Sequence, residues 1–245
     1  MENSKTPLRN HQANNFLLSI VVPVFNEETV ITEALDAILS TPYQKEVIVV
    51  DDGSTDGTRD IILKTKHLDV KVVLHEKNFG KGKAIQTGLN HVNGDIILIQ
   101  DADLEYDPSE YPILLQPIIS GNADVVFGSR FAGHGVHHTP HFWNYVGNRF
   151  LTMLSNLFTG LNLTDMETCY KVFTTEALKG IKINENRFGF EPEITAKIAK
   201  KKLRICEVPI SYHGRTYEEG KKIGWTDGIE AIWCIFKYNL KLNRK

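Results

Sequence analysis

Five apolar runs in the first 130 residues alternate with segments of helical periodicity. The runs are rich in β-branched residues and cover 17–25, 46–52, 70–76, 95–100 and 123–130. Continuous apolar runs of this length are typical of strands that are buried on both faces. In the intervening "NEETVITEALDAILS", Asn26 is the expected helix N-cap and acidic residues follow it in the first turn. Buried strands that alternate with helices predict right-handed βαβ crossovers and an α/β fold with a mostly parallel sheet flanked by helices.

The alternation weakens after residue 130, where we expect an elaborated C-terminal region of the same domain. A loop-like segment precedes an apolar-rich helix over 142–160, and "LRICEVPISY" (203–212) reads as one more strand. The last helix places five apolar residues on one face: Ile229, Ile232, Trp233, Phe236 and Leu240. The expected organisation is a polar leader over 1–16, one α/β domain over 17–225, and a basic amphipathic helix over 226–245 packed on or extending that domain.

Composition and charge narrow the class of protein. The chain of 245 residues is 42% hydrophobic and 24% charged with a net charge of −2, which gives no overall attraction to nucleic acid. Residues 197–245 carry 12 Lys and Arg against 5 Asp and Glu, so an anionic partner or a solvated basic surface is expected there. The 3 cysteines form no CxxC pair, which argues against a disulfide framework or a zinc site and fits a reducing cytoplasm. No signal peptide or membrane-spanning run is visible, so we expect a cytoplasmic protein that at most contacts a membrane surface.

Three of the predicted strands end in polar clusters. These are "PVFNEE", "VDDGSTDGT" and "QDADLEYDP". In an open parallel sheet, ligands bind at the carboxyl ends of the strands. Crowded carboxylates repel one another unless they are solvated, protonated or bound to a cation, and oxygen-rich clusters suit Mg²⁺ or Mn²⁺ together with substrate phosphates. A single DxD is also compatible with a solvated strand end, and the neighbouring Asp-Asp cluster is what favours a site.

The same clusters exclude two common ways of holding a nucleotide. Neither GxxxxGK[ST] nor GxGxxG is present at the expected positions, so a nucleotide held by carboxylates and bridged by a metal is the remaining interpretation. Asp51 or Asp52 is then a candidate for the base or ribose, and Asp103 for the metal that carries the diphosphate. Asp56 is better explained by turn formation and helix capping.

Five motifs in order carry a resemblance to a known family. "SIVVPVFNEE", "VIVVDDGSTDGT", "NFGKGKAIQTGL", "QDADLEYDP" and "VVFGSR" resemble family 2 glycosyltransferases with the GT-A (Rossmann-like) fold, over residues 17–225. The similar branch contains the dolichyl-phosphate and polyprenyl-phosphate hexosyltransferases. The resemblance implies that nucleotide-sugar-binding residues are Pro23, Glu27, Asp52, Lys81, Lys83 and Asp101. It also implies that Asp101, Asp103 and Glu105 bind Mg²⁺ or Mn²⁺, although the family often has Gln at the last position.

The resemblance assigns further residues to the acceptor side. Arg130 of "GSR" and Arg215 of "GRTYEEGKK" match residues expected near phosphates. The segment around Arg215 is longer than the family's RxxGxSK and lacks its Ser, so the match does not extend to Lys221 and Lys222. Asp165 in "DMETCYKVF" and Glu193 in "FGFEPE" are the matching acids.

The implied reaction is inverting, metal-dependent transfer of a hexose from a GDP-mannose-type or UDP-glucose-type donor, with Asp103, Arg130, Asp165 and Glu193 as catalytic candidates. A polyprenyl or dolichyl phosphate acceptor is already ionised, whereas a hydroxyl of a saccharide or glycolipid needs a carboxylate such as Asp165 or Glu193 as a base. Arg130, Arg215 and the basic C-terminal segment favour the lipid phosphate. A non-catalytic nucleotide-sugar-binding protein is the alternative from another class, and the complete acidic motif argues against it.

Two features stay open at this point. The helix over 142–160 and the last helix are compatible with a membrane interface, with packing in the core or with a homo-oligomer contact. The histidines at 134, 137, 138 and 141 favour an active-site loop over a zinc site. The sequence does not decide the sugar, the nucleotide base or the oligomeric state.

Overall fold

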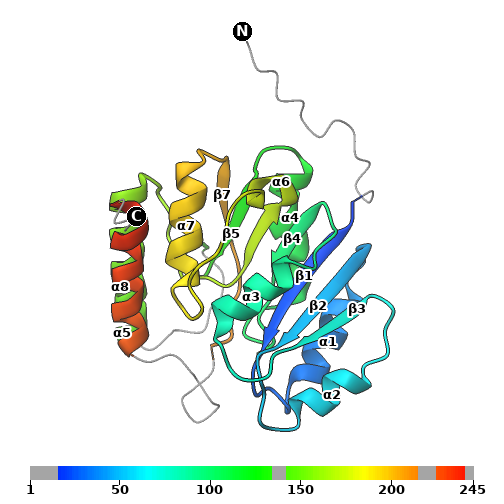
Figure 1. Cartoon of the computed structure of the whole chain (residues 1–245). Helices are drawn as coiled ribbons and strands as arrows, with labels where there is room; N and C mark the ends of the chain where they lie inside the picture. The colour runs from blue at the N-terminus through cyan, green and yellow to red at the C-terminus, as the bar shows by residue number, and fades with distance from the viewer. Residues whose placement is uncertain (1–15, 134–141, 215–224, 241–245) are drawn as a thin grey trace.

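A seven-stranded mixed sheet lies at the centre of the computed structural model, which describes residues 16–133, 142–214 and 225–240. Its strand order is β3-β2-β1-β4-β6-β5-β7 (Figure 1). The strands are β1 (Leu18–Val24), β2 (Lys45–Asp51), β3 (Val70–Leu74), β4 (Ile96–Ile99), β5 (Val125–Ser129), β6 (Lys171–Thr174) and β7 (Ile205–Pro209). Neighbouring strands are parallel except for β6, which runs antiparallel to both β4 and β5. The mostly parallel α/β sheet expected from the apolar runs is confirmed.

Strand β6 is the strand that the apolar runs did not indicate. Its sequence, KVFT, begins with a lysine and ends with a threonine, so it lacks the continuous apolar run of the other strands. Because it is antiparallel, Ile99 at the carboxyl end of β4 pairs with Lys171 at the start of β6. The segment that leads into β6 therefore arrives at the same sheet edge as the carboxyl ends of the parallel strands.

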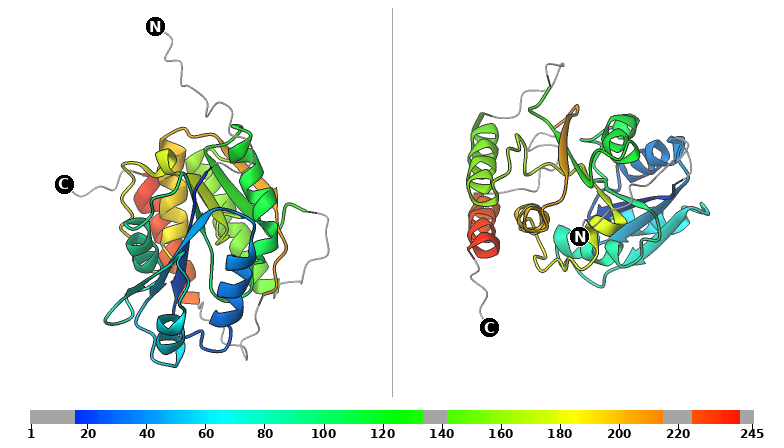
Figure 2. Two further views of the ribbon diagram at one scale, coloured as in Figure 1. Left: turned by 90° about the vertical axis from the view of Figure 1, so that its right-hand side faces the viewer. Right: turned by 90° about the horizontal axis from the view of Figure 1, so that it is seen from above.

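The helices form a layer on each face of the sheet. They are α1 (Ile31–Ser40), α2 (Thr58–Lys64), α3 (Lys81–Leu89), η1 (Pro108–Glu110), α4 (Tyr111–Ile119), α5 (Phe142–Thr159), α6 (Thr175–Leu178), α7 (Phe190–Lys200) and α8 (Trp225–Asn239). Helices α1 and α4 cover one face, and α3 and α7 cover the other (Figure 2). Helices α5 and α8 lie side by side and pack on α7, outside the two helical layers that cover the sheet.

Helix α1 begins later than its sequence pattern indicates, so the expectation that Asn26 is the N-cap is wrong. The helix starts at Ile31, and Val30 occupies the cap position without a side-chain hydrogen bond. Asn26 has a left-handed φ of 52° and its Oδ1 accepts a hydrogen bond of 2.8 Å from the Thr55 amide. Its side chain therefore joins the loop after β1 to the loop after β2, instead of capping a helix.

Helix α8 buries a different face from the apolar stripe seen in the sequence. Ala231, Cys234 and Ile235 are its buried apolar residues, whereas Ile229 and Trp233 are 57% and 58% exposed. Most of the stripe therefore faces outward and does not pack in the core. None of the helices in the described part of the chain is both long enough and apolar enough to cross a bilayer.

Candidate active site

The largest group of candidate residues lies where β1 and β4 are neighbours. The chain winds from β1 through β2 to β3 on one side and then returns to β4 on the other, so the topology switches between β1 and β4. A pocket of about 640 Å³ opens at their carboxyl ends. Its walls come from the loops after β1, β2, β4 and β5, from the segment before β6, and from α3, α5, α7 and α8. Ligand binding at this edge is what the open-sheet architecture favours.

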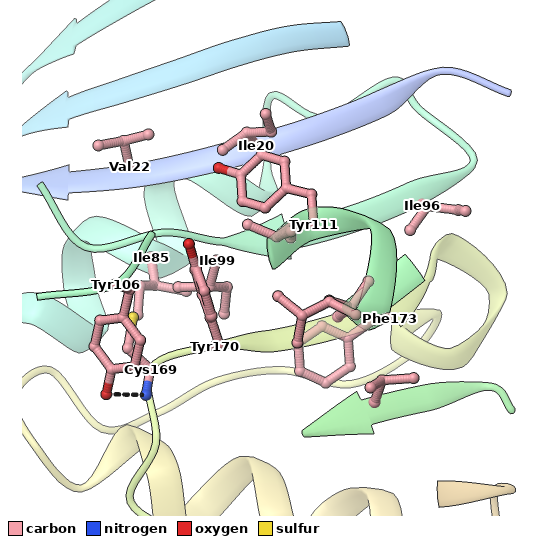
Figure 3. Close-up of a cluster of buried hydrophobic side chains, with 14 of the residues drawn as sticks. Ile20, Val22, Ile85, Ile96, Ile99, Tyr106, Tyr111, Cys169, Tyr170 and Phe173 are labelled. Carbon is pink, nitrogen blue, oxygen red and sulfur yellow. Dashed lines mark hydrogen bonds between the residues drawn. The ribbon is translucent and has the colours of Figure 1, made fainter. Parts of the chain in front are cut away.

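The acidic turn after β4 is held by a buried polar cluster. Gln100 is 2% exposed, and its Nε2 donates to the carbonyls of Asp101 and Tyr106 at 3.0 and 3.3 Å. Its Oε1 accepts hydrogen bonds from the Tyr111 and Tyr170 hydroxyls at 2.8 and 2.7 Å. Figure 3 shows these tyrosines in the core, together with the hydrogen bond from the backbone amide of Cys169 to Tyr106 Oη. The apolar run ending at Gln100 thus positions the acids that follow it, a role that the sequence pattern did not reveal.

The three acids proposed as metal ligands all line the pocket. Asp101 forms an ion pair of 2.9 Å with Lys81, and Glu105 accepts a hydrogen bond of 2.8 Å from the Tyr212 hydroxyl. Asp103 accepts from the Glu105 amide at 3.2 Å. Among the described residues, no three His, Cys, Asp or Glu side chains converge tightly enough to hold a metal ion by themselves. Mg²⁺ commonly binds one or two carboxylates and completes its shell with water and substrate phosphates, so Asp101 and Asp103 fit a metal that arrives with a diphosphate.

The charge balance of the pocket also fits a cation. Among the described residues, its lining contains 8 acidic residues against 2 basic ones, Lys81 and Arg130. Both basic residues form ion pairs with acids, Lys81 with Asp101 and Arg130 with Asp165. A diphosphate placed beside this excess of described acidic residues is favoured by a further cation. The residues present therefore fit a divalent ion such as Mg²⁺ or Mn²⁺.

Lys81 is positioned by the loop that precedes α3. Asp52 holds this loop by accepting hydrogen bonds from the Phe79 and Gly80 amides, at 3.0 and 2.7 Å, and from His75 Nδ1 at 2.7 Å. Burial alone would lower the pKa of Lys81, but the nearby acids, Asp101 first, raise that pKa well above its usual value. Lys81 is therefore a fixed positive charge in the pocket. Lys83 does not line the pocket, and its ammonium group contacts Gln86 at 3.3 Å.

Gly82 lets the first turn of α3 approach the segment before α7. A Cβ at this position would lie 2.4 Å from the Glu185 carbonyl oxygen and 2.9 Å from that of Arg187. Gly82→Ala is therefore expected to lower the free energy of unfolding by about 1–3 kcal/mol, because backbone atoms must shift. Urea denaturation measures this loss. Gly147→Ala in α5 is the control, since nothing lies within 4 Å of its Cβ, and an equal loss in both variants would contradict the packing argument.

The nucleotide-side candidates occupy the loops after β1 and β2. Pro23, Glu27 and Asp52 line the pocket, although Asp52 is engaged by the loop before α3. Asp51 lies away from the pocket lining and is buried in an ion pair of 2.6 Å with Arg59. Asp56 accepts a hydrogen bond of 3.0 Å from the Thr58 amide, which confirms its expected turn role, whereas the N-cap position of α2 is occupied by Gly57.

Arg130 and Asp165 form a buried bidentate pair. Asp165 Oδ2 accepts from Arg130 Nε at 2.6 Å, and Oδ1 accepts from Nη2 at 2.8 Å. Burial would raise the pKa of Asp165, but the Arg130 guanidinium outweighs it and lowers that pKa. Arg130 lines the pocket, whereas Asp165 is fully buried beside it and does not line it. The structure thus places Asp165 behind the arginine.

Glu193, the other predicted acid, also lies away from the pocket. Its carboxylate accepts hydrogen bonds from the Asn184 and Glu185 amides at 2.8–2.9 Å and pairs with Lys197. It therefore ties α7 to the preceding loop. Arg215, Lys221, Lys222 and the histidines of 134–141 lie outside the described residues.

Two acids that the sequence pattern did not single out do line the pocket. They are Glu167, before β6, and Glu191, in the first turn of α7. Glu191 Oε1 lies 3.6 Å from Lys81 Nζ, and burial together with the charge of Glu191 raises the pKa of Glu167 to about 8. Each is two residues away from a predicted acid, Asp165 or Glu193, in the motifs "DMETCYKVF" and "FGFEPE". Those motifs were the only available signal for them.

Comparison with solved structures shows which known fold this architecture resembles. The solved structure of glucosyl-3-phosphoglycerate synthase from Mycobacterium tuberculosis, in complex with Mn²⁺, UDP and phosphoglyceric acid, superposes with a TM-score of 0.72. The identity is 21%, and the match covers 91% of this chain and 78% of that chain. At this identity the likeness concerns the fold, and the expected GT-A-like architecture is confirmed.

Curated sequences are more similar. The chain is 32% identical over 215 residues to a low-salt glycan biosynthesis hexosyltransferase of Haloferax volcanii, covering 85% of this chain and 51% of the relative. It is 29% identical over 214 residues to a dolichyl-phosphate β-glucosyltransferase of Trichomonas vaginalis, covering 80% of this chain and 65% of the relative. This chain thus spans about half to two thirds of the length of these relatives. The profile of glycosyl transferase family 2 matches residues 19–181, and the chain belongs to that family.

Proposed function

We propose that this protein transfers a hexose from a nucleotide sugar to a polyprenyl phosphate, with inversion at the anomeric carbon. The observation that carries the acceptor assignment is that the pocket is walled by α5 and α8, the two helices that also expose a large apolar surface. The activities of similar proteins, such as the dolichyl-phosphate β-glucosyltransferase, support the same acceptor class.

The donor diphosphate is expected near Lys81, Asp101 and Asp103. Asp101 and Asp103 would hold a Mg²⁺ or Mn²⁺ ion together with phosphate oxygens, and Glu105 is the third candidate ligand on the same turn. Such an ion, when bound, stabilises the charge that develops on the departing diphosphate. Lys81 supplies a second, permanently charged contact because its pKa is raised. Pro23 and Glu27 line the part of the pocket proposed for the nucleoside.

The acceptor phosphate is expected at Arg130. A phosphate monoester is already ionised near neutral pH, so its oxygen attacks without a general base. The contact with Asp165 uses Nε and Nη2 of the guanidinium, so we expect the phosphate to meet the Nη1 edge. Tyr212 stacks near the guanidinium, with its ring centroid 5.0 Å away, and limits the positions that Arg130 can adopt.

The apolar surface continues outward from the pocket. We define the α5–α8 surface by its exposed residues Trp143, Val146, Phe150, Met153, Leu157, Ile229, Trp233 and Leu240. Trp143 also lines the pocket, so the surface and the pocket meet at this side chain. Arg149 is the one charged residue within the sequence of α5. A broad exposed apolar face of this kind marks a binding surface, and here it suits a prenyl chain or the membrane that carries it.

A donor-by-acceptor screen tests the proposed function. Nucleoside diphosphate release is measured with UDP- and GDP-hexoses, Mg²⁺ or Mn²⁺, and either a polyprenyl phosphate, a free saccharide or no acceptor. We expect release that depends on the lipid phosphate. Release that proceeds equally with a saccharide hydroxyl and without lipid would contradict the proposal.

Acceptor chain length tests the α5–α8 surface separately. Phe150→Ser with Leu157→Ser is expected to raise the KM for a long-chain polyprenyl phosphate by about tenfold, because apolar contact area is lost. The KM for a short, water-soluble prenyl phosphate should stay within about twofold. Leu68→Ser is the matched control, since Leu68 is fully exposed between α2 and β3 and does not line the pocket. Equal effects on both acceptors would show that the surface does not bind the chain.

A further inference from the structure

Three buried polar atoms in the pocket have no hydrogen-bond partner among the described residues. They are Asn144 Nδ2, Glu167 Oε1 and Glu191 Oε2. Buried polar groups in native proteins are normally satisfied by protein, water or a ligand. An amide nitrogen and two carboxyl oxygens that line the same pocket therefore indicate a polar ligand that bonds to them.

These residues come from three elements that line the pocket, and one of the residues, Glu191, lies beside the Lys81 ammonium group expected to meet the diphosphate. Asn144 lies in the first turn of α5, Glu167 before β6, and Glu191 in the first turn of α7. Lys81 Nζ lies 2.9 Å from Asp101 and 3.6 Å from Glu191, so one ammonium group separates Glu191 from the acidic turn. A group attached to the diphosphate is thus within reach of this wall. The Glu191 side chain is 4% exposed, so it is held in place in the wall of the pocket.

The chemistry of the three atoms selects among the parts of the substrates. Two acidic side chains with no free cation between them among the described residues disfavour a phosphate, and a prenyl chain offers no hydrogen bonds to them. Sugar hydroxyls donate to carboxylates and accept from an amide NH₂ group. Burial and the neighbouring Glu191 raise the pKa of Glu167 to about 8, so its carboxyl group can exchange hydrogen bonds with a sugar hydroxyl in either direction.

We propose that Asn144, Glu167 and Glu191 form the subsite that binds the hydroxyls of a neutral hexose and excludes a uronic acid. The proposal rests on the proposed function for the identity of the donor. It goes further because it assigns the sugar class to residues for which the family resemblance gave no role. A carboxylate on the sugar would be placed against the negative charge of Glu191, whereas a hydroxyl would donate to it.

The test compares Glu191→Gln, Glu167→Gln and the wild-type protein. Dissociation constants are measured for the nucleoside diphosphate, for its neutral-hexose derivative and for its uronic acid derivative, for example UDP, UDP-glucose and UDP-glucuronic acid or the guanosine equivalents. Binding requires no acceptor, so this measurement remains informative even if the acceptor assignment fails. Glu176→Gln is the matched control because its side chain is 82% exposed on α6.

In the wild type we expect the neutral sugar to bind at least tenfold more tightly than the uronic acid. Glu191→Gln should reduce this preference at least fivefold while affinity for the nucleoside diphosphate stays within twofold. Glu167→Gln and Asn144→Ala should weaken the neutral-sugar nucleotide by a similar factor, with unchanged thermal unfolding. Equal loss of affinity for the bare diphosphate would overturn the proposal, because the acids would then act on the diphosphate. An unchanged sugar preference in Glu191→Gln would also overturn it.

Discussion

Asp103→Asn is expected to reduce hexosyl transfer by at least about 100-fold, the scale typical of losing one electrostatic contact to a transition state. Asp103 lines the pocket on the turn that Gln100 and the buried tyrosines hold in place. The substitution removes one carboxylate from the proposed metal site, so charge on the leaving diphosphate is poorly stabilised. Initial rates of nucleoside diphosphate release over a Mg²⁺ or Mn²⁺ titration measure the effect.

Asp107→Asn provides the matched control for this result. Asp107 lies in the same acidic segment but is exposed and caps η1 by accepting a hydrogen bond of 2.8 Å from the Ser109 amide. An asparagine oxygen can accept the same bond, so activity should change by less than about twofold. Unchanged transfer by Asp103→Asn, or an equal loss in both variants, would rule out the assigned metal role.

Asp165→Ala is expected to lower the free energy of unfolding by about 3–5 kcal/mol. The variant leaves the Arg130 guanidinium buried without its bidentate partner. Urea denaturation of the purified protein measures the change. Glu176→Ala is the control, because its pair with Lys179 is exposed and worth little. A loss below about 1 kcal/mol would show that Arg130 finds another partner.

The pH dependence of the same comparison follows from the lowered pKa of Asp165. A carboxylate whose pKa is lower in the folded state stabilises the protein above its unfolded pKa, and this contribution is lost as the pH falls through the folded pKa. The difference between wild type and Asp165→Ala should therefore be complete at pH 7 and shrink below about pH 4, near the usual pKa of Asp. Activity measured at pH 7, under conditions where the variant is folded, then distinguishes whether Asp165 positions Arg130 or takes part in catalysis itself.

The tertiary structure places in the pocket two acids that differ from those indicated by the sequence motifs. Glu191 and Glu193 lie in the same helix, two residues and about 200° apart around its axis, so only one of them can face the pocket. A motif such as "FGFEPE" contains both and does not tell which face the helix presents. In the same way, the motif before β6 contains both Asp165 and Glu167 and does not tell which of them faces the pocket.

Helix α8 shows a similar limit of the pattern. Besides the stripe that contains Ile229 and Trp233, its sequence has apolar residues on the opposite face, so periodicity alone does not tell which face is buried. Packing against α5 and α7 buries Ala231, Cys234 and Ile235 and leaves Trp233 outside. The exposed surface, and its continuity with the pocket, exist only because of this packing.

From the sequence alone came the features that depend on local periodicity and on strand ends: six of the seven strands, the mostly parallel sheet, and the acidic turn over 101–105 at its carboxyl edge. These follow because a buried parallel strand needs a continuous apolar run, and the polar residues that end it must share one sheet edge. Strand β6, the roles of Gln100, Glu167 and Glu191, and the outward face of α8 were decided by tertiary contacts. A short antiparallel strand and the direction of a side chain leave no periodic trace, since they are set by what packs against them.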